Sequence, residues 1–149
     1  MAENRLQSED GRQAVEVLYG EDALVMGWHM AHFCQEGTPD NYHAVGITLG
    51  GILIASVVYS RYRHPDVEIH IMSTDKRWCT RRTLRHIFNY PFIQLECNRV
   101  TAHTDPAVPA VCNFLQRIGF VKEGLIREGS ADGDVLLLGM LRRECRWIN

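Results

Sequence analysis

The chain of 149 residues lacks the features that mark secreted, membrane-spanning or disordered proteins. Its longest apolar run, residues 52–59, is far shorter than the roughly 20 residues that span a bilayer. Residues 1–10 are polar and contain no signal-peptide core. The five cysteines are widely spaced without a C-x-x-C pair, so neither a disulfide framework nor a zinc site is expected. We therefore expect a single cytoplasmic domain over residues 1–149, with no membrane partner.

The chain also lacks an excess of charge of either sign. It has 16 Lys and Arg residues against 18 Asp and Glu residues, a net charge of −2. This balance excludes a generally basic nucleic-acid coat and makes nucleic acid an unlikely partner. No repeat, low-complexity tract or linker is present. Local patterns must therefore carry the functional information.

One such pattern is a basic segment, residues 75–86, in which five of the twelve residues are Lys or Arg. It follows a predicted strand and opens a predicted helix, where the helix dipole disfavours side-chain cations. Free N–H groups of a first helical turn, together with Arg side chains, form phosphate sites. We interpret the segment as a phosphate site. The alternatives are a solvated charged surface and direct binding of nucleic acid.

Alternating strand and helix patterns predict an α/β (α+β) fold with one central mixed, mostly antiparallel sheet of about seven strands and three to four helices. Asp22 is expected to cap the first helix, and Pro91 to end or kink the second. Gly50 and Gly51 predict a tight hairpin, and Gly119 a helix terminator. The strands are expected over residues 13–19, 43–49, 52–62, 67–73, 98–104, 120–127 and 134–141, and the helices over residues 21–35, 80–89 and 108–118.

Several side chains have predicted environments. Cys97 and Cys112 lie in apolar contexts and are expected in the core. His29 and His32 have helical spacing but lack a third ligand, so no metal site is expected there. One face of the first helix is expected to combine Leu24, Val25, Trp28, Ala31 and His32.

Three segments of the chain resemble the GNAT superfamily of acyl-CoA-dependent N-acyltransferases, and together the likeness extends over residues 13–147. Residues 67–84 resemble the strand and pyrophosphate loop of the family, R/Q-x-x-G-x-G/A. Residues 113–127, with their G-F-x-x-E-G-x-x-R run, are similar to ribosomal-protein and antibiotic acetyltransferases. Residues 139–147 resemble the closing strand of small members often carried by phages and prophages.

The first segment departs from the family pattern, which aligns with residues 76–81. Lys76 stands where the family has Arg or Gln, and Cys79 and Arg81 occupy the two glycine positions. The loop then has less backbone freedom to accept a phosphate, and the additional cations compensate for that loss.

The resemblance implies an enzyme that uses acetyl-CoA as co-substrate and no metal. In this superfamily a primary amine attacks the thioester directly in a ternary complex. The acceptor is an amine on a small molecule, a protein or a modified nucleotide, and a homodimer is possible by family habit. The resemblance assigns the pantetheine to the strand backbone and the pyrophosphate to the basic segment. The expected cofactor-binding residues are Ile71, Met72, Ser73, Lys76, Arg77, Trp78, Cys79, Thr80, Arg81, Arg82 and Asn113.

Glu68 and His70 are the candidate catalytic bases. With Met72 they alternate onto one face of the predicted strand, next to the implied thioester site. Glu68 matches the family habit, whereas His70 has an ordinary pKa better suited to proton transfer near neutrality. Alternatively, both side chains lie on a solvated strand face. Many relatives carry a Tyr as acid where this chain has Leu115, so the alternative function is a weakly catalytic or non-catalytic CoA-binding protein that regulates or inhibits a protein partner.

Overall fold

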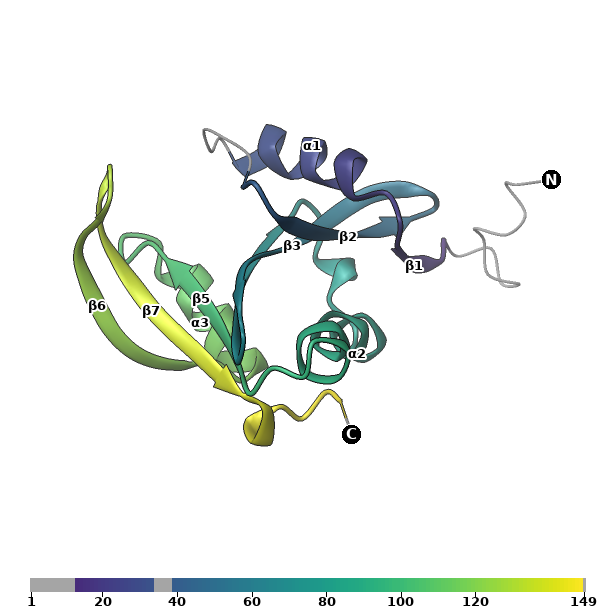
Figure 1. Ribbon diagram of the computed structural model, residues 1–149. Helices are drawn as coiled ribbons and strands as arrows, with labels where there is room; N and C mark the ends of the chain where they lie inside the picture. Colours follow the sequence, from purple (N-terminus) through teal and green to yellow (C-terminus); the bar gives the residue numbers. More distant parts are fainter. Residues whose placement is uncertain (1–12, 34–38, 149) are drawn as a thin grey trace. The chain divides into compact units, whose positions relative to one another are not determined.

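The computed structural model of the protein describes residues 13–33 and 39–148 (Figure 1). Seven strands form a mixed, mostly antiparallel sheet in the order β1-β2-β3-β4-β5-β7-β6, with three α-helices, and this confirms the predicted fold class. No helix in the described ranges is long and apolar enough to cross a membrane. In chain order the elements are β1 (Val15–Leu18), α1 (Asp22–Phe33), β2 (Tyr42–Leu49), β3 (Ile52–Arg63), β4 (Asp66–Ser73), the 3-10 turn η2 (Lys76–Trp78), α2 (Arg81–Asn89), the π-helical turn η3 (Tyr90–Gln94), β5 (Arg99–Thr104), α3 (Pro109–Ile118), β6 (Val121–Ser130), β7 (Gly133–Leu141) and the 3-10 turn η4 (Arg142–Glu144).

The chain divides into two compact units. The first unit comprises Met1–Arg61 and His70–Ile87, and the second comprises Tyr62–Ile69 and Phe88–Asn149. The boundary passes through β4, so Glu68 belongs to the second unit and His70 to the first.

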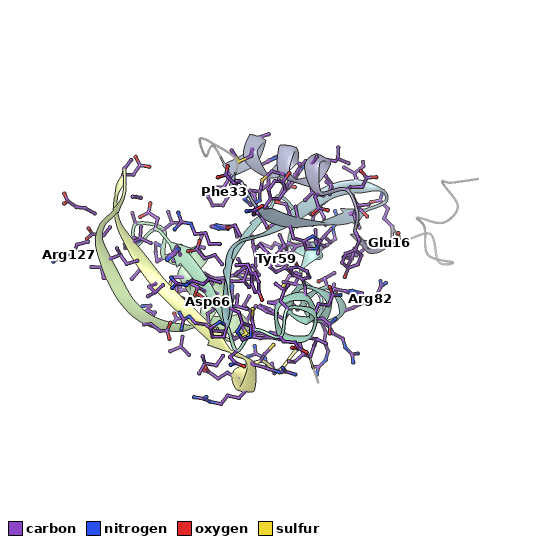
Figure 2. The ribbon with its side chains drawn as sticks, in the orientation of Figure 1. Glu16, Phe33, Tyr59, Asp66, Arg82 and Arg127 are labelled. Carbon is purple, nitrogen blue, oxygen red and sulfur yellow. The ribbon has the colours of Figure 1, made fainter. Side chains whose placement is uncertain are left out.

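In the first unit the β2–β3 hairpin turns at two glycines with positive φ, as predicted, and a helix packs on each face of the hairpin (Figure 1). Val25 and Met26 of α1 pack on Ala44 and Val58 of the strands. On the other face, the buried Tyr59 hydroxyl donates a hydrogen bond of 2.5 Å to the Ile87 carbonyl of α2. Tyr59 is labelled in Figure 2. The β2–β3 hairpin is thus packed between α1 and α2.

Of the five side chains predicted to share one face of α1, only Val25 is buried. The buried residues are Val25, Met26 and His29, whereas Leu24 is 59% exposed. The apolar residues of this helix are distributed around its whole circumference, so their spacing does not identify one buried face. The predicted end of the helix at Gln35 lies outside the described residues.

The predicted cap at Asp22 is also wrong. Asp22 is the first residue of α1, and its Oδ2 accepts a hydrogen bond of 3.1 Å from the Ala44 N–H and lies 2.9 Å from His43 Nδ1. The carboxylate therefore ties the start of the helix to β2. A non-local acceptor position of this kind has no signature in the local sequence.

α2 ends at Asn89, two residues before Pro91, as predicted. After α2, the π-helical turn η3 continues through Pro91, and the Leu95 N–H donates to the Tyr90 carbonyl. A π turn closes over five residues, so the missing proline N–H is accommodated without ending the turn. Phe92 of this turn is fully buried.

In the second unit, β5, β7 and β6 form an antiparallel ladder next to α3. The helix begins at Pro109 and ends at Gly119, whose φ of 121° and N–H bond to the Gln116 carbonyl confirm it as the terminator. Cys97 and Cys112 are 0% and 3% exposed, as expected for core thiols.

Candidate functional site

β4 carries both candidate bases. It pairs in parallel with β5 from Asp66↔Arg99 to Glu68↔Thr101, and the register ends at Glu68. Val67 and Ile69 are buried, at 1% and 3% exposure, while Glu68 between them is only partly buried. This alternation confirms the predicted parity of the strand and places the Glu68 side chain away from the core.

In the second unit Glu68 lies next to a histidine that the sequence analysis did not identify. Its Oε1 is 3.6 Å from Nδ1 of His103, on the neighbouring strand β5. The side chains are 13% and 27% exposed, so the pair is largely shielded from water yet reachable. This distance is too long for a hydrogen bond, but it allows an ion pair when the imidazole is protonated. The pairing depends on the parallel register, which local sequence patterns do not contain.

A polar chain on the same strands holds the register next to Glu68. The Thr101 hydroxyl donates to Asp66 on β4, at 2.8 Å to Oδ1, and Arg99 Nε donates to the Thr101 hydroxyl at 2.9 Å. The Arg99 guanidinium then forms a two-bond ion pair with Glu123 of β6, at 2.5 and 3.0 Å. Arg99 lowers the pKa of Glu123, chiefly through the side-chain hydrogen bond.

This ion pair crosses β7 above a glycine. A Cβ built on Gly139 would meet Glu123 Oε1 and would lie 2.6 Å from both terminal nitrogens of Arg99. The glycine therefore leaves the space in which β5 and β6 are joined across the strand between them. The polar chain thus extends over four strands and supports the β4–β5 ladder.

In the first unit two histidines form hydrogen bonds to two serines of β3. His70 Nε2 lies 3.2 Å from Ser60 Oγ, and His29 Nδ1 of α1 lies 2.6 Å from Ser56 Oγ. Ser56 and Ser60 are 0% and 4% exposed and share a face of the strand because they are four residues apart. In the sequence, the two serines in the otherwise largely apolar run of β3 could have indicated that polar side chains pack against this strand.

His29 is held neutral. Burial, and then the nearby His70, lower the pKa of His29 from 6.5 to about 4. Its side chain is 2% exposed and its ring stacks on Phe33 with 5.1 Å between centroids. Nδ1 of the neutral imidazole either donates or accepts one hydrogen bond, and the Ser56 hydroxyl is its partner.

The basic segment begins with an internally neutralised pair. Asp75 caps the turn η2 by accepting from the Arg77 N–H at 3.0 Å, and the Arg77 guanidinium donates to both carboxylate oxygens, at 2.6 Å to Oδ2. These bonds lower the pKa of Asp75 to about 2. The charge of Arg77 is therefore compensated, whereas the side chains of Lys76, Arg81 and Arg82 are exposed.

The N–H groups of the loop are used within the loop itself. Those of Trp78 and Cys79 donate to the Asp75 and Lys76 carbonyls, each at 3.3 Å. The Thr80 N–H donates to Thr83 Oγ1 at 2.9 Å. The Trp78 side chain is 3% exposed, so it faces the protein interior and not the solvent. These internal hydrogen bonds fix the backbone of the loop, in line with the limited backbone freedom expected from its lack of glycine.

The start of α2 has a different character. Thr80 Oγ1 accepts from the Thr83 N–H at 3.1 Å, which caps the helix. Among the described residues no acceptor takes the N–H groups of Arg81 and Arg82, the first two of the helix. Figure 2 shows Arg82 at this helix, and its Nη1 is 3.4 Å from the Val15 carbonyl. The N-terminus of α2 thus combines two N–H donors that have no acceptor among the described residues with the exposed side chains of Arg81 and Arg82.

The remaining predicted site residues lie on β4 and α3. Ile71, Met72 and Ser73 occupy the last part of β4, in the first unit. Asn113 is exposed on α3 in the second unit, and Leu115 on the same helix is 6% exposed. Leu115 therefore belongs to the core of the second unit. The described residues contain no group of three or more side chains arranged to hold a metal ion.

No family model matches the sequence, and no curated protein matches it. Solved structures do. The spermidine N-acetyltransferase from Vibrio cholerae in complex with CoA and spermine is 15% identical, with a TM-score of 0.68, over 91% of this chain and 98% of that one. Mutant forms of the spermidine/spermine N-acetyltransferase SpeG from the same organism give 15% identity and a TM-score of 0.71, over 87% and 94%. Its dodecameric form gives 16% and 0.69, over 86% and 94%. The chain therefore has the GNAT fold of these acetyltransferases.

Proposed function

We propose that the protein is an N-acetyltransferase that transfers an acetyl group from acetyl-CoA to a primary amine. The single observation that carries the proposal is the coincidence of this fold with a capped basic helix start directly after β4. Strand, loop and helix are the elements on which the resemblance expects the cofactor. The chemistry of their exposed groups suits a doubly charged pyrophosphate.

For the cofactor, we propose that the pyrophosphate binds the N–H groups of Arg81 and Arg82, with Lys76 adding charge. The loop contributes less than the family pattern implies, since its N–H groups already have acceptors. The pantetheine is assigned to the backbone of Ile71, Met72 and Ser73. Trp78 and Cys79 then support the loop from within, and Arg77 orders it through Asp75.

For the chemistry, we propose Glu68 as the base and His103 as its positioning partner. The incoming ammonium must lose a proton before its nitrogen can attack the thioester carbon. Glu68 accepts that proton directly or through a water, and His103 orients the carboxylate and stabilises its charge when the imidazole is protonated. The thiolate of CoA leaves and takes up a proton from water. His70, with its bond to Ser60, is the second candidate base.

The proposal also specifies which classes of amine should be tested as acetyl acceptors. The similar structures are spermidine N-acetyltransferases, one of them bound to spermine, so polyamines are the first amines to test. The run G-F-x-x-E-G-x-x-R keeps the resemblance to ribosomal-protein and antibiotic acetyltransferases as a prediction from sequence, and peptide amines are therefore the second class.

The test measures release of free thiol from acetyl-CoA against polyamines, peptide amines and amino-modified nucleotides. We expect turnover with at least one amine, and a loss of about 100-fold in kcat for Glu68→Gln. His103→Gln should lower kcat less than Glu68→Gln does and leave KM for acetyl-CoA unchanged, a split that a general loss of structure would not produce. If His70→Ala abolishes turnover and Glu68→Gln does not, His70 is the base.

Cofactor binding is tested separately with Arg81→Glu combined with Arg82→Glu. We expect KM for acetyl-CoA to rise at least about tenfold, because two attractive charges become repulsive at the phosphate. Arg127→Glu is the matched control, since Arg127 extends from the β6–β7 hairpin, outside the basic segment (Figure 2). Equal effects of the two changes would place the phosphate elsewhere.

A second candidate function is a CoA-binding regulator or inhibitor of a protein partner. Two observations favour it: Leu115 is buried where relatives have a Tyr acid, and the loop N–H groups have internal acceptors. Binding of acetyl-CoA without thiol release across the amine panel would support this function over catalysis.

A further inference from the structure

The second unit contains a pocket that takes no part in the proposed acetyl transfer. It has a volume of about 530 Å³, within the range of small-molecule sites of roughly 300–1,000 Å³. It lies where β5 begins and β7 ends, and none of its lining residues belongs to β4 or α2. The lining residues are Ile93, Asn98, Leu141, Arg142, Arg143 and Ile148.

The backbone around this pocket is held by hydrogen bonds. The Arg142 N–H donates to the Asn98 carbonyl at 2.9 Å, and the Asn98 N–H donates to the Pro65 carbonyl at 3.0 Å. The turn η4 closes with the Cys145 N–H on the Arg142 carbonyl at 3.1 Å, and the Cys145 side chain is 3% exposed. The two arginines therefore extend from an anchored turn, which lowers the entropic cost of binding a ligand.

Among the described residues that line the pocket, two are arginines and none is acidic. Among the described residues, neither Arg142 nor Arg143 forms an ion pair or a side-chain hydrogen bond. The adjacent acid, Glu144, is engaged elsewhere, since its Oε1 accepts from the Leu141 N–H at 3.2 Å. Two guanidinium groups at the wall of a cavity favour an anionic ligand, and their planar donor pairs match a carboxylate.

Apart from Asn98, the rest of the lining is apolar. Ile93 is 43% exposed although it borders a cavity, and Leu141 and Ile148 are half-buried. Covering these three aliphatic side chains would remove apolar surface from water, which favours binding at about 25 cal/mol for each Å² covered. The ligand that satisfies both parts of the lining has an anionic head and an aliphatic body.

We propose that this pocket binds a small aliphatic carboxylate, with the carboxylate on Arg142 and Arg143 and the aliphatic chain on Ile93, Leu141 and Ile148. Asn98 also lines the pocket, and a side-chain amide of this type can donate to a carboxylate. A free carboxylic acid and the C-terminus of a peptide that ends in an aliphatic residue share this chemistry. The site is independent of acetyl transfer, so its test does not depend on turnover.

Isothermal titration with octanoate tests the proposal on the whole chain. Octanoate should bind, while octanol and octylamine should bind at least about tenfold more weakly, because only the carboxylate can pair with the arginines. Arg142→Gln combined with Arg143→Gln should lower octanoate affinity by at least about tenfold. Arg117→Gln, an exposed arginine of the same unit outside the pocket, is the matched control.

Ile93→Ser tests the apolar part without touching the charges, and it should weaken octanoate while leaving acetate binding unchanged. A peptide ending in leucine, compared with its C-terminal amide, distinguishes the two sources: tighter binding of the free-acid peptide than of octanoate assigns the site to peptide termini. Equal binding of octanoate and octanol overturns the proposal. So does an equal effect of the paired arginine variant and Arg117→Gln, or the absence of any octanoate heat.

Discussion

His29 should make the protein less stable as the pH is lowered, and His29→Gln should remove this contribution to the loss of stability. The imidazole is 2% exposed, and its pKa is lowered from 6.5 to about 4 by burial and by His70. The neutral form is thus favoured in the folded chain, while the unfolded chain takes up a proton at the ordinary pKa. His29 therefore causes no loss of stability above pH 6.5, and its cost grows as the pH falls through the window from 6.5 to about 4.

The size of the effect follows from the two pKa values, 6.5 and about 4. Their difference corresponds to about 3 kcal/mol in the free energy of unfolding once the pH lies below both values, at 1.36 kcal/mol for each pH unit. Between pH 7.5 and pH 5 the loss is about 2 kcal/mol. Glutamine does not titrate, and its amide can still form a hydrogen bond with Ser56, so the variant separates charge from packing.

Urea unfolding at pH 7.5 and pH 5 measures the effect. The decrease in the free energy of unfolding on acidification should be smaller by about 2 kcal/mol in His29→Gln than in the natural sequence. His32→Gln removes an exposed histidine from the same helix and serves as the control. An unchanged decrease in His29→Gln, or an NMR titration of His29 above pH 6, would refute the reasoning.

Two other substitutions probe the supports of the candidate site. Gly139→Ala should separate Arg99 from Glu123 and cost about 1 kcal/mol, and in a double-mutant cycle the coupling of these two residues should vanish in the alanine background; a persisting coupling contradicts this. Tyr59→Phe should cost about 1–2 kcal/mol in urea unfolding, since it leaves the buried Ile87 carbonyl without its donor. Unaltered stability in Tyr59→Phe would show that the carbonyl finds another partner.

Local sequence patterns predict most of the fold. Alternation in β4, the glycine pair between β2 and β3, and the terminator Gly119 are signals carried by neighbouring residues, and each was confirmed. The buried face of α1 could not be predicted, because apolar residues surround that helix. Asp22 resembled a cap in sequence, but its acceptor role is decided by β2, which lies twenty residues away in the chain.

The candidate site shows the same division. The basic segment and the two candidate bases are visible in sequence because they are clustered or alternate within one strand. The partner of Glu68 is not, since His103 reaches it only through the parallel register of β4 with β5. Likewise, the cations of the segment could be counted, but the pairing of Arg77 with Asp75 and the internal use of the loop N–H groups depend on the turn that forms there.

The most direct test of the central proposal is mass spectrometry of a cell extract incubated with the protein and isotopically labelled acetyl-CoA. The account predicts a labelled acetyl group on at least one amine, with release of free CoA, and its loss when Arg81→Glu and Arg82→Glu are combined. Absence of any labelled product, together with an unchanged melting temperature in millimolar CoA or acetyl-CoA, would contradict it.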